Sequence, residues 1–483
     1  MRCRREIPKF ASAATFGVAF VICFVLGADR APAAPDAPVP AASATPDPAP
    51  TATAAVRPER LSIHAQITDT QQYHGAFPAG YSGSQSLTPN PDTAKTVDAT
   101  IFFGVRLGKG TEFYINPEFD QGFGLGNPPA ALGQMYNGTF GVAGFVSAEA
   151  YKVGRGSAYG RIQRVFVRQT FGLGGGDPQA VAPAINQLGG TLEPANLIVT
   201  AGKFGVVDVF DTNPYAHDPK NDFLNWSIVD MGSFDYPADA WGYTYGVSAE
   251  LTRGASTLRA GLFQLSATPN EIEIEHQPLR QYGAVLECER RTNLLGGHPG
   301  AVKGLFYADI GYMGAYADAV ALGAAGGTLP LTADVRFNKH IKAGAGLNIA
   351  QEVAPDIGVF ARLSAMNGTW EAYDFTEIDR SISGGVSVAG ERYHRPNDAF
   401  GLAVARNGIS GPAQQYFAAG GLGVLVGDGA LSYAGEHIIE TYYKLGISPA
   451  FGLTFDVQRI TNPGYDTVRG PVSVYGLRYH AQF

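Results

Sequence analysis

Alternating apolar and polar positions recur along most of this chain, and they predict a protein built from β-strands. In residues 97–107 every second position from Val97 to Leu107 is apolar, whereas Asp98 and Arg106 lie between them. Successive side chains of a strand point to opposite faces, so a period of two indicates a strand with one apolar and one polar face.

The last eleven residues, 473–483, show which environment suits such strands. Tyr475, Leu477, Tyr479 and Phe483 belong to one face, and the positions between them include charged and amide side chains. An aromatic and apolar outer face with a polar inner face fits a wall between lipid and water. A soluble sandwich is the alternative, but it would have to cover this apolar stripe.

Seventeen segments carry the pattern, and a transmembrane up-and-down barrel needs an even number of strands. One candidate is therefore wrong or one is missing, and we expect an all-β antiparallel barrel of 16 strands, with 18 as the alternative. The candidates are 61–73, 97–107, 111–119, 140–151, 158–171, 196–205, 241–252, 256–267, 280–291, 301–313, 339–350, 356–367, 379–390, 398–408, 436–448, 451–458 and 473–483.

The first 59 residues have a different character. Residues 1–33 begin with four basic residues, followed by an uncharged stretch and a small-residue exit, which predicts a secretory signal peptide rather than a membrane anchor. Residues 34–59 are rich in Ala and Pro and predict a disordered linker, either a spacer or a wall-binding segment. Residues 60–483 are the predicted barrel.

Charge and motifs exclude several classes of function. The formal net charge of −8 argues against nucleic acid as a partner. The chain contains no GxSxG or HExxH motif, and its nine His form no pair at metal spacing. We therefore expect no enzyme activity, no cofactor and no metal site.

Residues 206–240 interrupt the strand pattern and predict a long loop folded at the pore. The loop contains seven Asp and six aromatic residues, including Asp208, Asp211 and Trp226. Long ordered loops are usually functional, and carboxylates beside aromatic rings suit sugars. Packing of the loop on the barrel rim is an equally weighted alternative, and a calcium loop is a weaker one because the Asp spacing does not match the EF-hand pattern.

Strand parity identifies charged residues that we expect in the lumen. An Arg on the lipid face at the bilayer midplane costs about 2–4 kcal/mol, which places Arg164, Arg168 and Arg362 inside. Parity also places Glu287 and Glu289 there. Arg161 and Gln163 have the opposite parity to Arg164, so their strand needs a bulge or a late start. Such charges either contact a solute or form salt bridges that brace the barrel.

Six stretches of the chain resemble the carbohydrate-selective porins of the OprB type: 145–156, 164–175, 202–226, 239–246, 287–291 and 469–483. The resemblance covers most of the chain after about residue 60, although the Pro-rich segment departs from it. It implies a 16-stranded channel in the outer membrane of a Gram-negative bacterium, through which glucose-like sugars diffuse inward.

The resemblance also implies the partners of the chain. These are carbohydrate solutes, outer-membrane lipid and the barrel assembly machinery, which recognises the C-terminal strand; a homo-oligomer stays open. The alternatives are a general or anion-preferring porin without sugar specificity, a wall-tethering structural barrel and an outer-membrane lipase.

Overall fold

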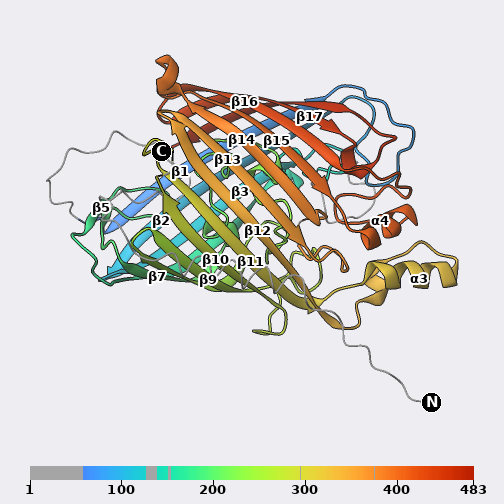
Figure 1. Cartoon of the computed structure of the whole chain (residues 1–483), viewed down its shortest axis with the longest axis horizontal. Helices are drawn as coiled ribbons and strands as arrows, with labels where there is room; N and C mark the ends of the chain where they lie inside the picture. The colour runs from blue at the N-terminus through green and yellow to red at the C-terminus, as the bar shows by residue number, and fades with distance from the viewer. Residues whose placement is uncertain (1–57, 127–138, 151–153, 294, 375) are drawn as a thin grey trace, which may run out of the picture. The chain divides into compact units, whose positions relative to one another are not determined.

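The 16 strands of the predicted wall form a closed antiparallel barrel (Figure 1). The structure is a computed structural model, and it describes residues 58–126, 139–150, 154–293, 295–374 and 376–483. The first and last strands, β1 (Leu61–His74) and β18 (Val472–Gln482), pair with each other and close the wall. Two short strands, β5 (Gln179–Val181) and β6 (Gly190–Leu192), form a separate sheet, so the barrel has 16 strands and not 18.

The other strands of the wall are β2 (Asp92–Gly108), β3 (Thr111–Phe123), β4 (Arg155–Gly172), β7 (Asn196–Phe204), β8 (Thr244–Arg253), β9 (Ser256–Gln264), β10 (Tyr282–Thr292), β11 (Gly300–Tyr312), β12 (Lys339–Ala354), β13 (Ile357–Met366), β14 (Arg380–Ala389), β15 (Ala399–Gly408), β16 (Glu436–Ser448) and β17 (Phe451–Thr461). The predicted signal peptide and all of the predicted linker except residues 58 and 59 lie outside the described residues.

One predicted strand, 140–151, is wrong. Its described part, residues 140–150, contains no strand, and residue 151 lies outside the described residues. Val142 and Val146 are fully buried, and the Val146 carbonyl accepts hydrogen bonds from the lumenal side chains of Gln72 and Gln458. The segment therefore lies inside the barrel, where apolar residues are buried on every side and alternation does not indicate a strand.

The two faces of the wall follow the predicted parity. Ile101 and Phe455 are exposed on the outer face, whereas Asp98 and Asp456 are buried on the inner face. In β4 the register shifts so that Asn116 pairs with Arg164 and the next residue of β3 pairs with Ile162. Gln163 is thus the extra residue of a β-bulge. The bulge confirms the expected irregularity and lets Arg161 and Arg164, which have opposite parity, both face the lumen.

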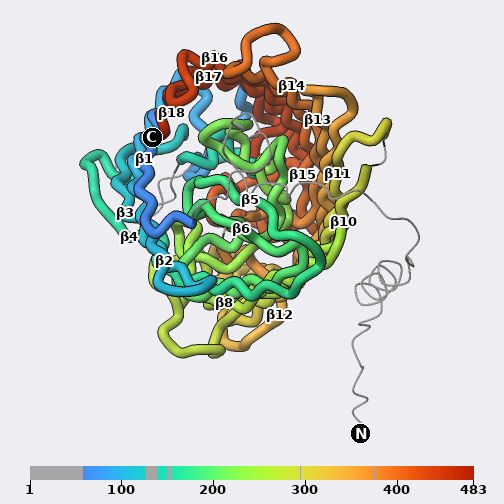
Figure 2. Tube along the Cα trace, turned by 90° about the vertical axis from the view of Figure 1, so that its left-hand side faces the viewer, coloured from blue at the N-terminus to red at the C-terminus, as the bar shows by residue number. Residues whose placement is uncertain are grey.

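The two ends of the barrel differ in the length of their connections. At the end that carries the start of β1 and the end of β18, four hairpins have connections of two residues each. At the other end β3–β4 and β7–β8 are joined by long segments. Outer-membrane barrels have short periplasmic turns and longer extracellular loops, so we place the short-turn end, seen in Figure 2, in the periplasm.

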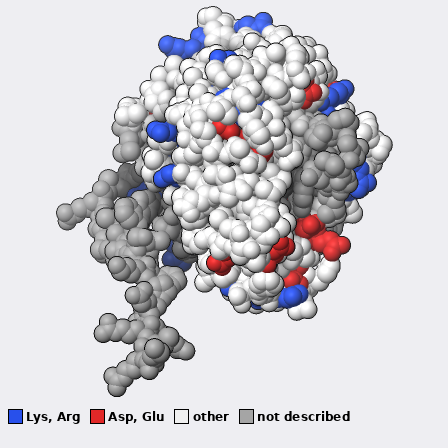
Figure 3. Space-filling model, turned by 90° about the vertical axis from the view of Figure 1, so that its right-hand side faces the viewer, with Lys and Arg blue, Asp and Glu red and all other residues white. Residues whose placement is uncertain are grey.

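The extracellular end carries the larger helices. The rings of Tyr316 and Tyr416, from α3 (Tyr316–Gly326) and α4 (Gly411–Ala418), lie 5.0 Å apart (Figure 1). In Figure 3 the surface at this end is mostly uncharged. The remaining helices are η1 (Val206–Asp208), α2 (Trp226–Val229), η2 (Thr332–Val335), η3 (Gly390–Tyr393) and η4 (Pro463–Tyr465). In the part of the chain that the structure describes, no helix has the length and apolar character needed to cross a membrane.

The C-terminal residue provides a test of the wall. Phe483 is 72% exposed on the outer face, and its backbone exchanges two hydrogen bonds with Ala65 of β1. We expect Phe483→Ser to lower the yield of folded barrel several-fold, because it removes the outward aromatic group at the closing seam. Heat-modifiable migration of the outer-membrane fraction measures this yield. Phe483→Tyr is the control that keeps the ring, and normal assembly of Phe483→Ser would contradict the prediction.

Candidate functional site

Two segments from the extracellular end fold into the lumen and fill much of it. Residues 223–240 of the predicted long loop are all buried. Residues 139–147 are also buried; they belong to the connection between β3 and β4, which we call the shorter segment. The segments bond to each other, since the amides of Trp226 and Ala148 donate to the carbonyls of Phe145 and Leu224. Within the long loop, Asp208 is exposed and residues 217–222 are half-buried, so these positions face the remaining water.

Carboxylates of the wall hold the backbone of these segments. Glu440 of β16 accepts hydrogen bonds from the amides of Leu224 and Asn225. Glu436, also on β16, accepts bonds from the amides of Ala143 and Gly144 at 2.9 and 2.8 Å. A backbone amide that is buried without a partner is costly, so each carboxylate stabilises the inward position of its segment.

Arg362 and Asp211, both predicted site residues, form a buried pair at the base of the long loop. The Arg362 Nε atom lies 3.1 Å from Asp211 Oδ1, and the two side chains are 1% and 0% exposed. The guanidinium also donates to the carbonyls of Ile228 and Ala216 at 2.8 Å each. The parity of Arg362 was predicted correctly, and its contacts favour bracing of the loop over contact with a solute.

Glu287 and Glu289 lie on the inner face of β10, as predicted. Arg259 Nη1 lies 2.8 Å from a Glu287 oxygen and 2.7 Å from a Glu289 oxygen. The other Glu287 oxygen accepts a bond from the Asp211 amide at 2.8 Å. Glu287 is therefore shared between the wall and the loop, and Arg259, which was not predicted, completes the cluster.

Arg164 and Asp208 form the accessible ion pair of the predicted set. The guanidinium makes two parallel bonds to the carboxylate, from Nε to Oδ2 at 2.7 Å and from Nη2 to Oδ1 at 2.6 Å. The Tyr243 ring lies 4.9 Å from the guanidinium carbon. The side chains of the pair retain 18% and 30% exposure. Wall and loop thus present a fixed donor and acceptor array to water inside the barrel.

Arg168 lies four residues further along β4, nearer the periplasmic end, and is half-buried. Its Nη1 atom donates to the Asn186 carbonyl at 2.8 Å, and its guanidinium carbon lies 5.2 Å from the centre of the Tyr114 ring. Its partner therefore comes from the β4–β7 connection and not from the long loop.

Trp226, one of the aromatic residues of the predicted loop, is only 4% exposed. Its ring stacks on Phe145 of the shorter segment, with ring centres 5.0 Å apart and planes inclined by 17°. The two lumenal segments thus contact each other at this ring. The stacking favours anchoring of the loop by Trp226 over contact of this ring with a sugar.

Lys220 is a lumenal residue that was missed from the sequence. Its ammonium lies 2.7 Å from Asp98 of β2 and 2.8 Å from Glu149 of the shorter segment. It joins the tip of the long loop to the wall and to the second segment. Parity identifies inward residues only on strands, so a loop cation of this kind gives no such signal. Its only sequence signal is a Lys within the acidic loop.

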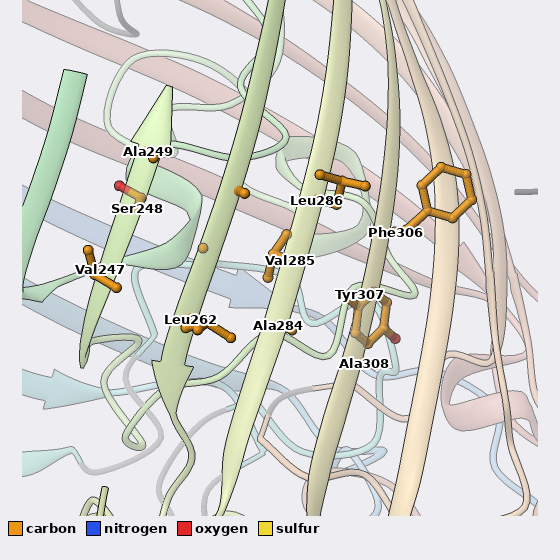
Figure 4. A pocket seen from close by; sticks show the side chains of 12 residues that line it. Val247, Ser248, Ala249, Leu262, Ala284, Val285, Leu286, Phe306, Tyr307 and Ala308 are labelled. Carbon is orange, nitrogen blue, oxygen red and sulfur yellow. The ribbon is translucent and has the colours of Figure 1, made fainter. Parts of the chain in front are cut away.

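The chemistry of the lumen is that of ion pairs and hydrogen bonds. Among the described residues no group of three or more His, Cys, Asp or Glu side chains is arranged to hold a metal ion. The groove shown in Figure 4 is lined by apolar residues of β8 to β11, such as Leu262, Leu286 and Phe306. Leu262 and Leu286 are exposed on the outer face, so this groove belongs to the lipid side of the wall.

A closed barrel whose lumen is narrowed by inward segments and lined by charged pairs defines a porin. The family model described as "Carbohydrate-selective porin, OprB family" matches residues 84–483. The chain therefore belongs to the OprB family of carbohydrate-selective porins, which are channels of the Gram-negative outer membrane.

A solved structure shows the same fold at low sequence identity. The high-pH structure of Pseudomonas putida OprB is 16% identical in sequence. The match covers 88% of this chain and 94% of the OprB chain, with a TM-score of 0.65. The outer-membrane channel DcaP of Acinetobacter baumannii is 9% identical, and the match covers 88% of this chain and 97% of that one with a TM-score of 0.45. No curated protein sequence matched the chain.

The buried and accessible arginines are expected to differ in their effect on stability. Arg362→Ala leaves Asp211 charged and buried, which costs about 3–5 kcal/mol of unfolding free energy. Arg164→Ala removes a partly exposed pair and costs about 0–1 kcal/mol. Denaturant unfolding in detergent, followed by tryptophan fluorescence, measures both. Equal losses for the two variants would show that Arg362 does not brace the loop.

Proposed function

We propose that this barrel lets mono- or small oligosaccharides diffuse passively from outside the cell into the periplasm. The observation that carries the proposal is the Arg164–Asp208 pair, which joins wall to loop and stays open to water. A guanidinium offers donors and a carboxylate offers acceptors in a planar array. Sugar hydroxyls both donate and accept, so such a pair exchanges bonds with them along the path.

Charge balance separates this proposal from a general or anion-preferring porin. Two parallel bonds tie the Arg164 guanidinium to Asp208, and Lys220 lies between Asp98 and Glu149. Paired charges attract neutral polar solutes through hydrogen bonds but give little net field for an ion. The pairing therefore supports selection of sugars over selection of anions.

We also propose that residues 1–33 direct export and that residues 34–59 form a spacer before the barrel. The outward Phe483 suits recognition of the terminal strand by the assembly machinery, and the exposed apolar outer face suits outer-membrane lipid. These assignments rest on the sequence pattern and on the family.

Planar bilayer recording of the purified channel tests the proposed function. In potassium chloride, stepwise addition of glucose or maltose is expected to lower the conductance in a saturable manner, because a bound sugar occupies the path of the ions. Mannitol at equal osmolarity controls for viscosity and for nonspecific polyol effects. A conductance that falls equally with all three solutes would support a general porin.

Replacement of Arg164 tests its contact with sugar. We expect Arg164→Ala to raise the sugar concentration for half-block by about tenfold to a hundredfold, since a hydrogen bond to a charged group contributes about 1.5–3 kcal/mol. Arg290→Ala is the matched control, because Arg290 is exposed on the outer face of β10 and its loss changes the net charge equally. Unchanged block in Arg164→Ala would make Arg164 a bracing residue only.

A further inference from the structure

The β4–β7 connection is unusually long for the periplasmic end. It spans residues 173–195, whereas four hairpins at the same end have connections of two residues. It contains the small sheet of β5 and β6, and Figure 2 shows both strands within the outline of the barrel wall. We call residues 173–195 the exit segment. A connection that served only as a turn would not need this length or this position.

The tip of the exit segment is docked on the inner face of the wall. Asn186 Oδ1 accepts a bond from the lumenal Asn116 Nδ2 at 2.9 Å, and the Asn186 carbonyl accepts one from Arg168. Leu188 is 3% exposed and shares an apolar cluster with Tyr114 and Phe166. The tip thus enters the lumen and buries an apolar side chain there, which fixes its position.

Residues next to the tip attach it to the start of the barrel. The Glu59 amide donates to the Gly189 carbonyl at 2.9 Å, and the Gly189 amide donates to Glu59 Oε2 at 2.7 Å. Arg106 of β2 donates to the carbonyls of Glu59 and Gly189 at 2.9 and 3.2 Å. The tip is therefore held from β2, from β3 and β4, and from Glu59, which lies two residues before β1.

Arg164 and Arg168, two of the lumenal arginines of β4, are held by connections from opposite sides of the membrane. Arg164 is bound by Asp208 of the extracellular loop, and Arg168 is bound by Asn186 of the exit segment. Four residues of a strand span ~13 Å. Two inward-folded connections thus meet the same strand at two levels.

We propose that the exit segment forms a second constriction, in series with the Arg164–Asp208 level, and that it admits small neutral polar solutes at the periplasmic side. The exit segment contains only two charged residues, Asp177 and Glu193, and Glu193 is bound to the Gly174 amide. Its tip presents amide and carbonyl groups, which bond hydroxyls in both directions. The solute class rests on the proposed sugar function, whereas the constriction itself does not.

The test shortens the exit segment without changing the wall. Gln179 and Leu192 are paired across β5 and β6, so residues 180–191 can be replaced by an Asn-Gly turn. Channels inserted in one orientation are recorded in potassium chloride, with polyethylene glycols of graded size added to one face. If two equal resistances act in series, removal of one raises the conductance about twofold. We also expect larger polymers to enter from the periplasmic face only.

A second variant keeps the test decisive if the shortened chain does not fold. Leu188→Asp places a charge against Tyr114 and Phe166, which undocks the tip, and Leu188→Met is the control that keeps it docked. The proposal would be overturned if the shortened chain or Leu188→Asp folds and keeps the wild-type conductance and polymer exclusion. A channel without sugar block that still shows the one-sided change would refute the sugar function and keep the second constriction.

Discussion

The interior of this barrel depends on acidic side chains that accept hydrogen bonds from backbone amides. Glu436, Glu440 and Glu287 perform this role for the two lumenal segments, and Glu377 accepts bonds from three consecutive amides at Val424, Leu425 and Val426. A segment without regular structure cannot pair its own amides, and inside the barrel little water reaches them. The inward carboxylates remove this cost and determine where each segment lies.

This constraint connects the wall to the solute path. Alternation along each strand supplies polar inward positions, and bulky carboxylates at those positions fix the loops that narrow the lumen. Once the loops are fixed, a few pairs remain in contact with water, and Arg164 with Asp208 is the clearest. Arg362 and Glu287 have the same parity as the accessible residues, but they support the loop. We therefore propose that selectivity arises at the contact between wall and loop.

The wall was predictable from the sequence because parity is a local property of a strand. It placed all 16 strands near their observed positions and turned Arg164 and Arg362 inward. It failed for residues 140–150, because a segment buried on every side shows apolar residues at any spacing. It also could not separate Arg164 from Arg362, since accessibility depends on contacts with residues more than forty positions away. Lys220 was missed because parity identifies inward residues only on strands, and Lys220 lies in a loop.

Amide hydrogen exchange of the purified channel in detergent tests most directly whether both segments are fixed inside the lumen. Mass spectrometry of peptides from residues 139–150 and 206–240 gives their exchange rates, and peptides from β16 and β17 give the rate of the wall. The account predicts that the lumenal peptides exchange nearly as slowly as the wall, and that Glu440→Gln speeds exchange at Leu224 and Asn225. Exchange of both segments at the rate of free peptides would contradict it and leave the wall alone to set selectivity.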